Sequence, residues 1–166
     1  MEQTSIIGII HEKSENVFYE KRHFQKMKER PKTWLTHTEN YLETPKSLTF
    51  DQMRELHQKL LKEIENDPVG QELYDELIGE ATTYAEIRAK WLSLDRSQKM
   101  EQDSFRTACH NSVITHFNMM ARYLKTQGKN TEWRDALGYE EDDKYFRKTI
   151  GDFGCYIVFI NSLCAR

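Results

Sequence analysis

Apolar side chains between Asp103 and Leu124 recur at the spacing of one helix face. At about 100° per residue they fall within a single arc, and polar residues such as Asn111 and Thr115 fall opposite. This arc is wider than the roughly 100° stripe of an ordinary surface helix, so we expect the segment to be the central helix of the fold. Its apolar members are Phe105, Cys109, Val113, Phe117, Met120, Tyr123 and Leu124.

Capping and breaking residues predict the boundaries of the other helices. Thr49, with Gln52 three residues later, has the pattern of a capping box and predicts a helix to about residue 65. Pro68 suits the first turn of a second long helix, which ends near residue 94. Gly128 and Gly138 stand where the central helix and a short helix over 131–137 would each end on a left-handed residue.

Together with a last helix over 144–165, these segments predict an all-α fold. We expect a single domain, a helical bundle of about five main helices, in which residues 1–48 form a less regular helix and loop packed on a bundle of residues 49–166. A chain of 166 residues can bury such a core without disulfides or metal. The second long helix has an apolar face formed by Leu73, Leu77, Ala81, Tyr84, Trp91 and Leu92.

The last predicted helix is apolar on nearly all sides, so we expect it to be buried. Its most apolar stretch, 153–165, is shorter than the roughly 20 residues that span a bilayer, and Asn161 interrupts it, so no membrane contact is predicted. Gly151, Gly154 and Ser162 share one strip of this helix. Because each glycine costs a helix interior about 1 kcal/mol, close approach of a neighbouring helix would explain the two glycines.

Ionisable residues lie on or beside the apolar faces of the two long helices. Burying an unpaired charge costs several kcal/mol, so a buried arginine requires an anion. In one interpretation, carboxylates of adjacent helices supply it and the histidines are hydrogen-bonded core residues. In a second, these side chains line a pocket for a phosphate or carboxylate ligand. In a third, they extend outward and their polar ends reach solvent. The four residues are Arg88, Arg106, His110 and His116. Their possible polar partners are Glu80, Asp103 and Asp152.

Metal binding and nucleophilic catalysis have weaker support. A di-iron bundle needs two Glu-x-x-His pairs, and the chain has one, from Glu20 to His23. A three-histidine site could combine His57 with His110 and His116, but no spacing enforces it, so we predict no metal site and no cofactor. Cys109 precedes His110 directly and would point about 100° away from it on a helix, so the two cannot act as nucleophile and base for each other.

Composition and charge limit the cellular location and the kinds of partner that we expect. The net charge of −3 argues against general binding of polyanions, although the basic segment 21–32 could contact nucleic-acid phosphates. Three cysteines form an odd set without CxxC spacing, which is typical of reduced thiols in a cytoplasmic protein. The apolar run 5–10 is too short for a secretion signal, so we predict a cytoplasmic location.

Two segments, RTACHNSVITHFN (106–118) and RKTIGDFGCYIVFINSLCAR (147–166), resemble a small bacterial family of uncharacterised proteins. The resemblance covers the C-terminal half. It implies a bacterial, cytoplasmic origin, and because that family has no assigned activity, it implies no catalytic residues.

From these observations we expect a non-enzymatic binding or protein-interaction module, with an anion site near Arg88, Arg106 and His110. Self-association as a homodimer through an apolar helix face is compatible with the pattern. One alternative is a metal-dependent or other enzyme that uses the same polar centre. Another is a nucleic-acid-associated regulator that uses segment 21–32, which the net acidic charge disfavours.

Overall fold

The computed structural model describes residues 41, 46–139 and 146–164, which form five α-helices and no strand. They are α4 (Phe50–Ile64), α5 (Pro68–Trp91), α6 (Arg96–Thr126), α7 (Glu132–Asp135) and α8 (Phe146–Cys164). The predicted all-α bundle is therefore confirmed for this part of the chain. The expectations for residues 1–40, including Glu20, His23 and segment 21–32, lie outside the described residues, as does the start of the last helix before residue 146.

The predicted helix starts are confirmed by their hydrogen bonds. Thr49 Oγ1 accepts from the Gln52 amide at 3.2 Å, and the Gln52 side chain accepts from the Thr49 amide at 2.8 Å, so the capping box at α4 is complete. Asp67 caps α5 by accepting from the Gly70 amide at 3.1 Å, with Pro68 in the first turn. Asp95 and Gln98 form a second complete capping box at α6.

The predicted glycine stops are also confirmed. Gly128 has φ +69° and Gly138 has φ +78°, a left-handed conformation that other residues adopt only at a cost. At the end of α6 the amide of Lys129 donates to the Leu124 carbonyl at 3.0 Å, and the amide of Gly128 donates to Lys125 at 3.1 Å. This pair of bonds is a Schellman motif, which satisfies carbonyls that the helix leaves unpaired.

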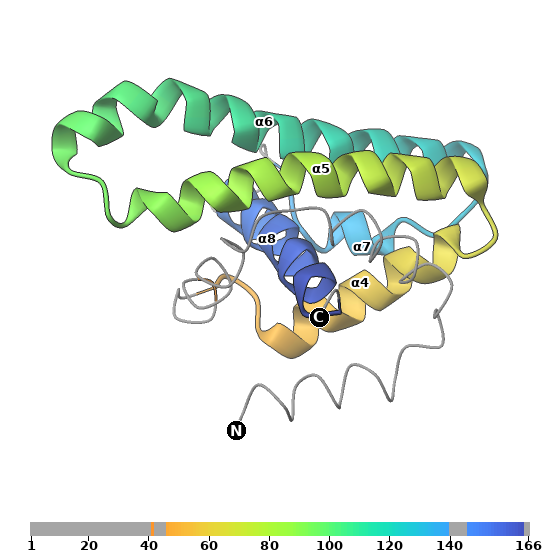
Figure 1. Ribbon diagram of the computed structural model, residues 1–166. Coiled ribbons are helices and arrows are strands. Elements are labelled where there is room, and N and C mark those ends of the chain that lie inside the picture. Colours follow the sequence, from red (N-terminus) through yellow and green to blue (C-terminus); the bar gives the residue numbers. More distant parts are fainter. Residues whose placement is uncertain (1–40, 42–45, 140–145, 165–166) are drawn as a thin grey trace.

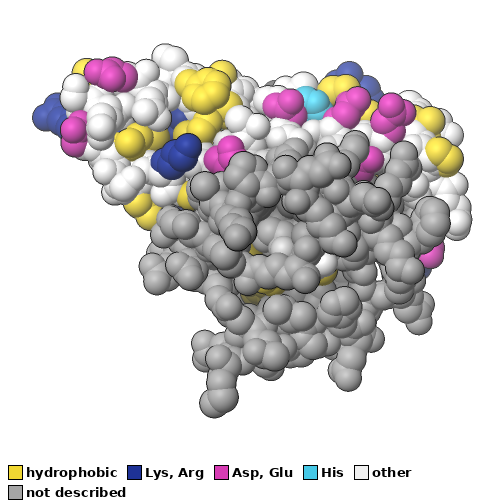
Figure 2. Space-filling view, viewed as in Figure 1, with side chains coloured by type: hydrophobic (Ala, Val, Ile, Leu, Met, Phe, Trp, Pro, Cys, Tyr) yellow, Lys and Arg dark blue, Asp and Glu magenta, His cyan; other side chains and the backbone are white. Residues whose placement is uncertain are grey.

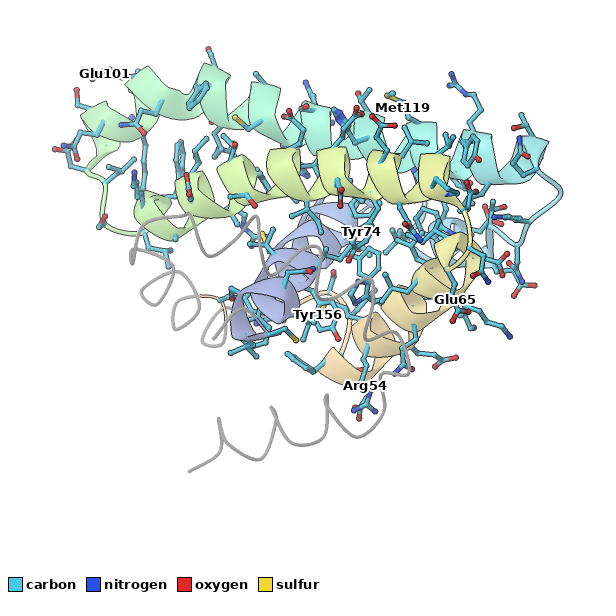
Figure 3. All side chains as sticks on the ribbon, turned by 45° about the vertical axis from the view of Figure 1, so that its right-hand side comes forward. Arg54, Glu65, Tyr74, Glu101, Met119 and Tyr156 are labelled. Carbon is cyan, nitrogen blue, oxygen red and sulfur yellow. The ribbon has the colours of Figure 1, made fainter. Side chains whose placement is uncertain are left out.

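Helices α5 and α6 form a long antiparallel hairpin, and α8 crosses one side of it, where α4 and α7 also lie (Figure 1). The end of the hairpin, around the turn from α5 to α6, extends beyond α8 in this view. The core between the elements is rich in aromatic side chains. Tyr74 of α5 and Tyr156 of α8 are both fully buried and both lie close to His57 of α4, with ring centroids 5.9 and 5.8 Å away (Figure 3).

The central helix is α8, not α6 as the sequence predicted. Sixteen of the nineteen residues of α8 are buried, whereas only six of the thirty-one residues of α6 are. Burial along α6 begins at Cys109, because the preceding turns belong to the projecting end of the hairpin. Phe105 and Leu92, both predicted to face the core, are for the same reason 59% and 70% exposed.

The glycines of α8 lie where the hairpin approaches most closely, as predicted. A Cβ on Gly151 would stand 2.9 Å from both His110 Nε2 and the Tyr84 hydroxyl, and a Cβ on Gly154 would stand 3.1 Å from Val113. Larger residues would therefore push α8 away from α5 and α6. None of the described helices has the length and apolar character needed to cross a membrane.

Candidate functional site

The predicted polar centre contains one buried ion pair. Arg88 of α5 donates through Nη1 to Asp152 Oδ1 of α8 at 2.7 Å, and the Asp152 side chain is only 1% exposed. The other oxygen of Asp152 accepts from the amide and the hydroxyl of Ser47, at 3.1 and 3.2 Å. Both carboxylate oxygens thus have donors, and the charge of Arg88 is compensated inside the protein.

A thiol and a second cation border this pair. Arg88 Nη1 lies 3.8 Å from Cys155 Sγ, but burial raises the pKa of the Cys155 thiol to about 11. The thiol therefore stays protonated at neutral pH, and a protonated thiol is a poor nucleophile. Lys46 lies 4.1 Å from the centre of the Tyr41 ring, and burial lowers the pKa of its amino group.

His110 of α6 is a buried, hydrogen-bonded histidine. Its Nε2 donates to the backbone carbonyl of Arg147 at 2.7 Å, and its ring stacks on Tyr84 with centroids 4.6 Å apart. Burial lowers the pKa of His110 to about 4, and the charges of Arg147, Arg88 and Arg106 also oppose protonation. The neutral ring therefore joins α5, α6 and the first turn of α8.

Arg106 does not lie in the core, contrary to the prediction. Its side chain is 32% exposed and pairs with Asp103 one turn earlier on α6, with Nη2 and Oδ1 2.7 Å apart. Its guanidinium also lies 4.7 Å from the centre of the Trp91 ring of α5. The residue sits at the end of the hairpin because α8 does not reach this part of α6.

Glu80 and His116 belong to a partly exposed polar group on the hairpin, away from the ion pair. Ser112 Oγ donates to Glu80 Oε2 at 2.8 Å, and His116 Nδ1 donates to the Ser112 carbonyl at 2.8 Å. His116 is half-buried, so the prediction that it lies in the core is wrong. Glu80 therefore accepts a hydrogen bond from Ser112 and does not pair with Arg88 or Arg106.

The three histidines considered for a metal do not come together. His57 bonds to the Tyr74 hydroxyl at 2.5 Å, between α4 and α5, far along the bundle from the stacked His110. Within the described ranges no group of three or more histidine, cysteine or acidic side chains could hold a metal ion. Cys109 and Cys155 are buried thiols, and no disulfide joins cysteines in the described part of the chain.

Two features escaped the sequence-based prediction. The hairpin end, defined here as Trp91, Leu92, Met100, Phe105 and Arg106, exposes large apolar side chains to solvent: Met100 is 72% exposed, beside the values given above for Leu92 and Phe105. Figure 2 shows hydrophobic side chains of this end among basic and acidic ones. The periodic pattern did not predict this exposure, because it does not show which part of a helix is covered by neighbouring helices.

The second missed feature is a fully buried arginine, Arg134 of α7. It lies in a helix of only four residues, too short for a periodic pattern to reveal which side faces inward.

No protein-family model, curated protein or solved structure matches this chain. The resemblance of residues 106–118 and 147–166 to a bacterial family therefore stays a prediction.

Proposed function

We propose that this chain is a non-enzymatic protein-interaction module whose contact surface is the hairpin end. The observation that carries the proposal is that Leu92, Met100 and Phe105, which lie in the α5–α6 turn and the first turns of α6, are each more than half exposed. Scattered single apolar residues need no explanation on a protein surface. Several large ones gathered on one projecting element are typical of an interaction site.

The chemistry of the polar centre supports a binding role over a catalytic one. Asp152 is sealed and bonded at both oxygens, the Cys155 thiol is protonated, and His110 uses Nε2 in a structural hydrogen bond. General acid or base catalysis needs a group that can reach a substrate proton. These residues instead fix α8 to the hairpin, and so fix the platform from which the hairpin end projects.

The partner that this surface fits best is a second copy of the chain. Charges of both signs alternate on the first turns of α6, where the exposed Arg96 and the half-buried Lys99 precede the exposed Glu101 and Asp103. In a two-fold dimer each patch faces its own copy, so a patch that carries both signs can pair with itself. Two hairpin ends packed side by side would make a four-helix arrangement.

The expected dimer is weak and reversible. If the three apolar side chains expose roughly 100 Å² each, two copies would bury roughly 600 Å², which at about 25 cal/mol per Å² gives about 15 kcal/mol. Association itself costs about 4–15 kcal/mol, which leaves about 0–11 kcal/mol, and roughly 600 Å² is well below the roughly 1,200 Å² that stable specific interfaces bury. We therefore expect a dissociation constant in the micromolar range or above.

Sedimentation velocity over a range of concentrations tests the proposal. The unmodified chain should shift from monomer to dimer with rising concentration, and Met100→Ser or Phe105→Ser should weaken the dimer at least about tenfold, because each removes a central apolar contact.

Met119→Ser is the matched control. Met119 lies on the same helix, is also exposed, and stands far from Glu101 at the hairpin end (Figure 3). A monomer at all concentrations would refute self-association. Loss of the dimer in Met119→Ser but not in Met100→Ser would place the interface elsewhere on α6.

A further inference from the structure

Arg134 differs from Arg88 and Arg106 in having no carboxylate partner among the described residues. Its side chain is 2% exposed, yet its described hydrogen bonds go only to neutral acceptors. Nε donates to Asn118 Oδ1 of α6 at 2.9 Å, and Nη1 donates to the carbonyl of Gly138 at 2.7 Å. Arg88 and Arg106, by contrast, each have a carboxylate oxygen at 2.7 Å.

The neighbouring acidic residue, Asp135, favours the charge of Arg134 from a distance but forms no ion pair with it. Asp135 accepts from the Tyr139 hydroxyl at 2.5 Å, and no ion pair joins it to Arg134 within the described part of the chain. The guanidinium lies 4.5 Å from the centre of the Tyr139 ring, whose face attracts a cation but does not neutralise it. Burial lowers the pKa of Arg134, as expected for a charge removed from water.

The guanidinium also has unused donors. It carries five N–H groups, of which the two described bonds use two. Nη2 makes no hydrogen bond among the described residues. The adjacent Trp133 also has a polar atom without a partner, because its Nε1 is sealed from solvent and makes no hydrogen bond. Nη2 therefore has two N–H groups left to donate to a further acceptor.

We propose that Arg134 is the core of a binding site for a small oxyanion, a phosphate or carboxylate group. Arginine forms its strongest bonds with such groups, because a charged acceptor roughly doubles the strength of the hydrogen bond. Asn118 helps to build the site: its Oδ1 faces Nε and fixes the plane of the guanidinium, which leaves the Nη2 edge for the ligand. This site is separate from the hairpin end and does not depend on dimer formation.

Thermal unfolding in inorganic phosphate, compared with sodium chloride at the same ionic strength, tests the site. Phosphate at about ten times its dissociation constant should raise the melting temperature by about 4 °C. Arg134→Gln should abolish the rise. Arg54→Gln on α4, which removes an arginine already paired with Asp51, should leave the rise unchanged.

A second variant keeps the test sharp if Arg134→Gln does not fold. Asn118→Asp puts a carboxylate of the same shape 2.9 Å from Nε, so it should raise the melting temperature in phosphate-free buffer and remove the response to phosphate. The proposal is refuted if phosphate does not raise the melting temperature of the unmodified chain. That is the result expected when an internal carboxylate already occupies the site. It is also refuted if Asn118→Asp keeps the full response, or if Arg54→Gln loses it.

Discussion

Arg88 and Arg106 have the same chemistry but lie in different surroundings. The partner of Arg88 is sealed, whereas Asp103, the partner of Arg106, is largely exposed. Removing one member of a buried pair leaves an uncompensated charge and costs about 3–5 kcal/mol, while an exposed pair contributes about 0–1 kcal/mol.

We therefore predict that Asp152→Asn lowers the free energy of unfolding by about 3 kcal/mol, near the low end of that range because Arg88 retains some contact with water. The matched substitution Asp103→Asn should change it by less than about 1 kcal/mol. Urea unfolding followed by circular dichroism measures both. Equal effects of the two substitutions would show that the Arg88–Asp152 pair does not hold α8 to α5.

His110 gives the fold a predicted dependence on pH. Its pKa is about 4 in the folded chain and about 6.5 when unfolded, so the folded state binds fewer protons between these values. The contribution of neutral His110 is complete above about pH 6.5 and is lost as the pH falls toward 4. We expect a loss of at most about 2 kcal/mol by pH 5.

Unfolding by urea at pH 7 and pH 5 measures this contribution. In His110→Gln, whose amide can still donate toward Arg147, the part of the pH dependence that belongs to His110 should vanish, whereas His116→Gln should retain it. If His110→Gln keeps the full dependence, another group is responsible.

At the residue scale, the sequence predicted the ion-pair partners of the two arginines better than it predicted which side chains are buried. Asp103 and Asp152 were both named as possible partners, and the structure pairs one with each arginine. Burial was predicted less well, because it depends on how far a neighbouring helix extends. Arg106, Phe105 and Leu92 are exposed since α8 ends its contact with the hairpin before reaching them.

Among the elements, α8 is the one on which the others pack, and its glycines set the distance to the hairpin. Gly151→Ala would bring a Cβ within 2.9 Å of Tyr84 and His110, two rings that are stacked on each other and cannot both move away cheaply. Overpacking costs about 1–3 kcal/mol and alanine returns up to about 1 kcal/mol of helix propensity. We expect a net loss of about 1–2 kcal/mol.

Gly79→Ala is the corresponding control, because a Cβ on Gly79 of α5 would meet nothing within 4 Å. It should stabilise the chain by up to about 1 kcal/mol. Thermal or urea unfolding of both variants gives the comparison. A stabilising Gly151→Ala would mean that α8 and the hairpin are not in close contact.

Helix boundaries were predictable because caps and glycine stops act locally. Thr49, Gly128 and Gly138 each perform the role that their sequence context indicated. The identity of the central helix was not predictable from α6 alone. A wide apolar arc on α6 and an apolar circumference on α8 both indicate burial, and only the packing shows that α8 is enclosed along nearly its whole length.

For the whole molecule, the structure separates a closed core from an open end. The core pairs Arg88 with Asp152 and holds His57 and His110 in hydrogen bonds, so it serves to position the hairpin. The hairpin end carries apolar and charged groups into solvent, and our central claim is that a second copy covers it. Arg134 lies away from that end, and its proposed oxyanion site can be tested without reference to the dimer.

Hydrogen–deuterium exchange at low and high protein concentration tests the central claim most directly, because it locates any contact between copies along the chain. Amides on the α5–α6 turn and the first turns of α6, from Leu92 to Arg106, are predicted to exchange more slowly at high concentration, while those around Met119 should not change. Exchange that is independent of concentration at the hairpin end, or protection confined to another surface, would contradict the claim.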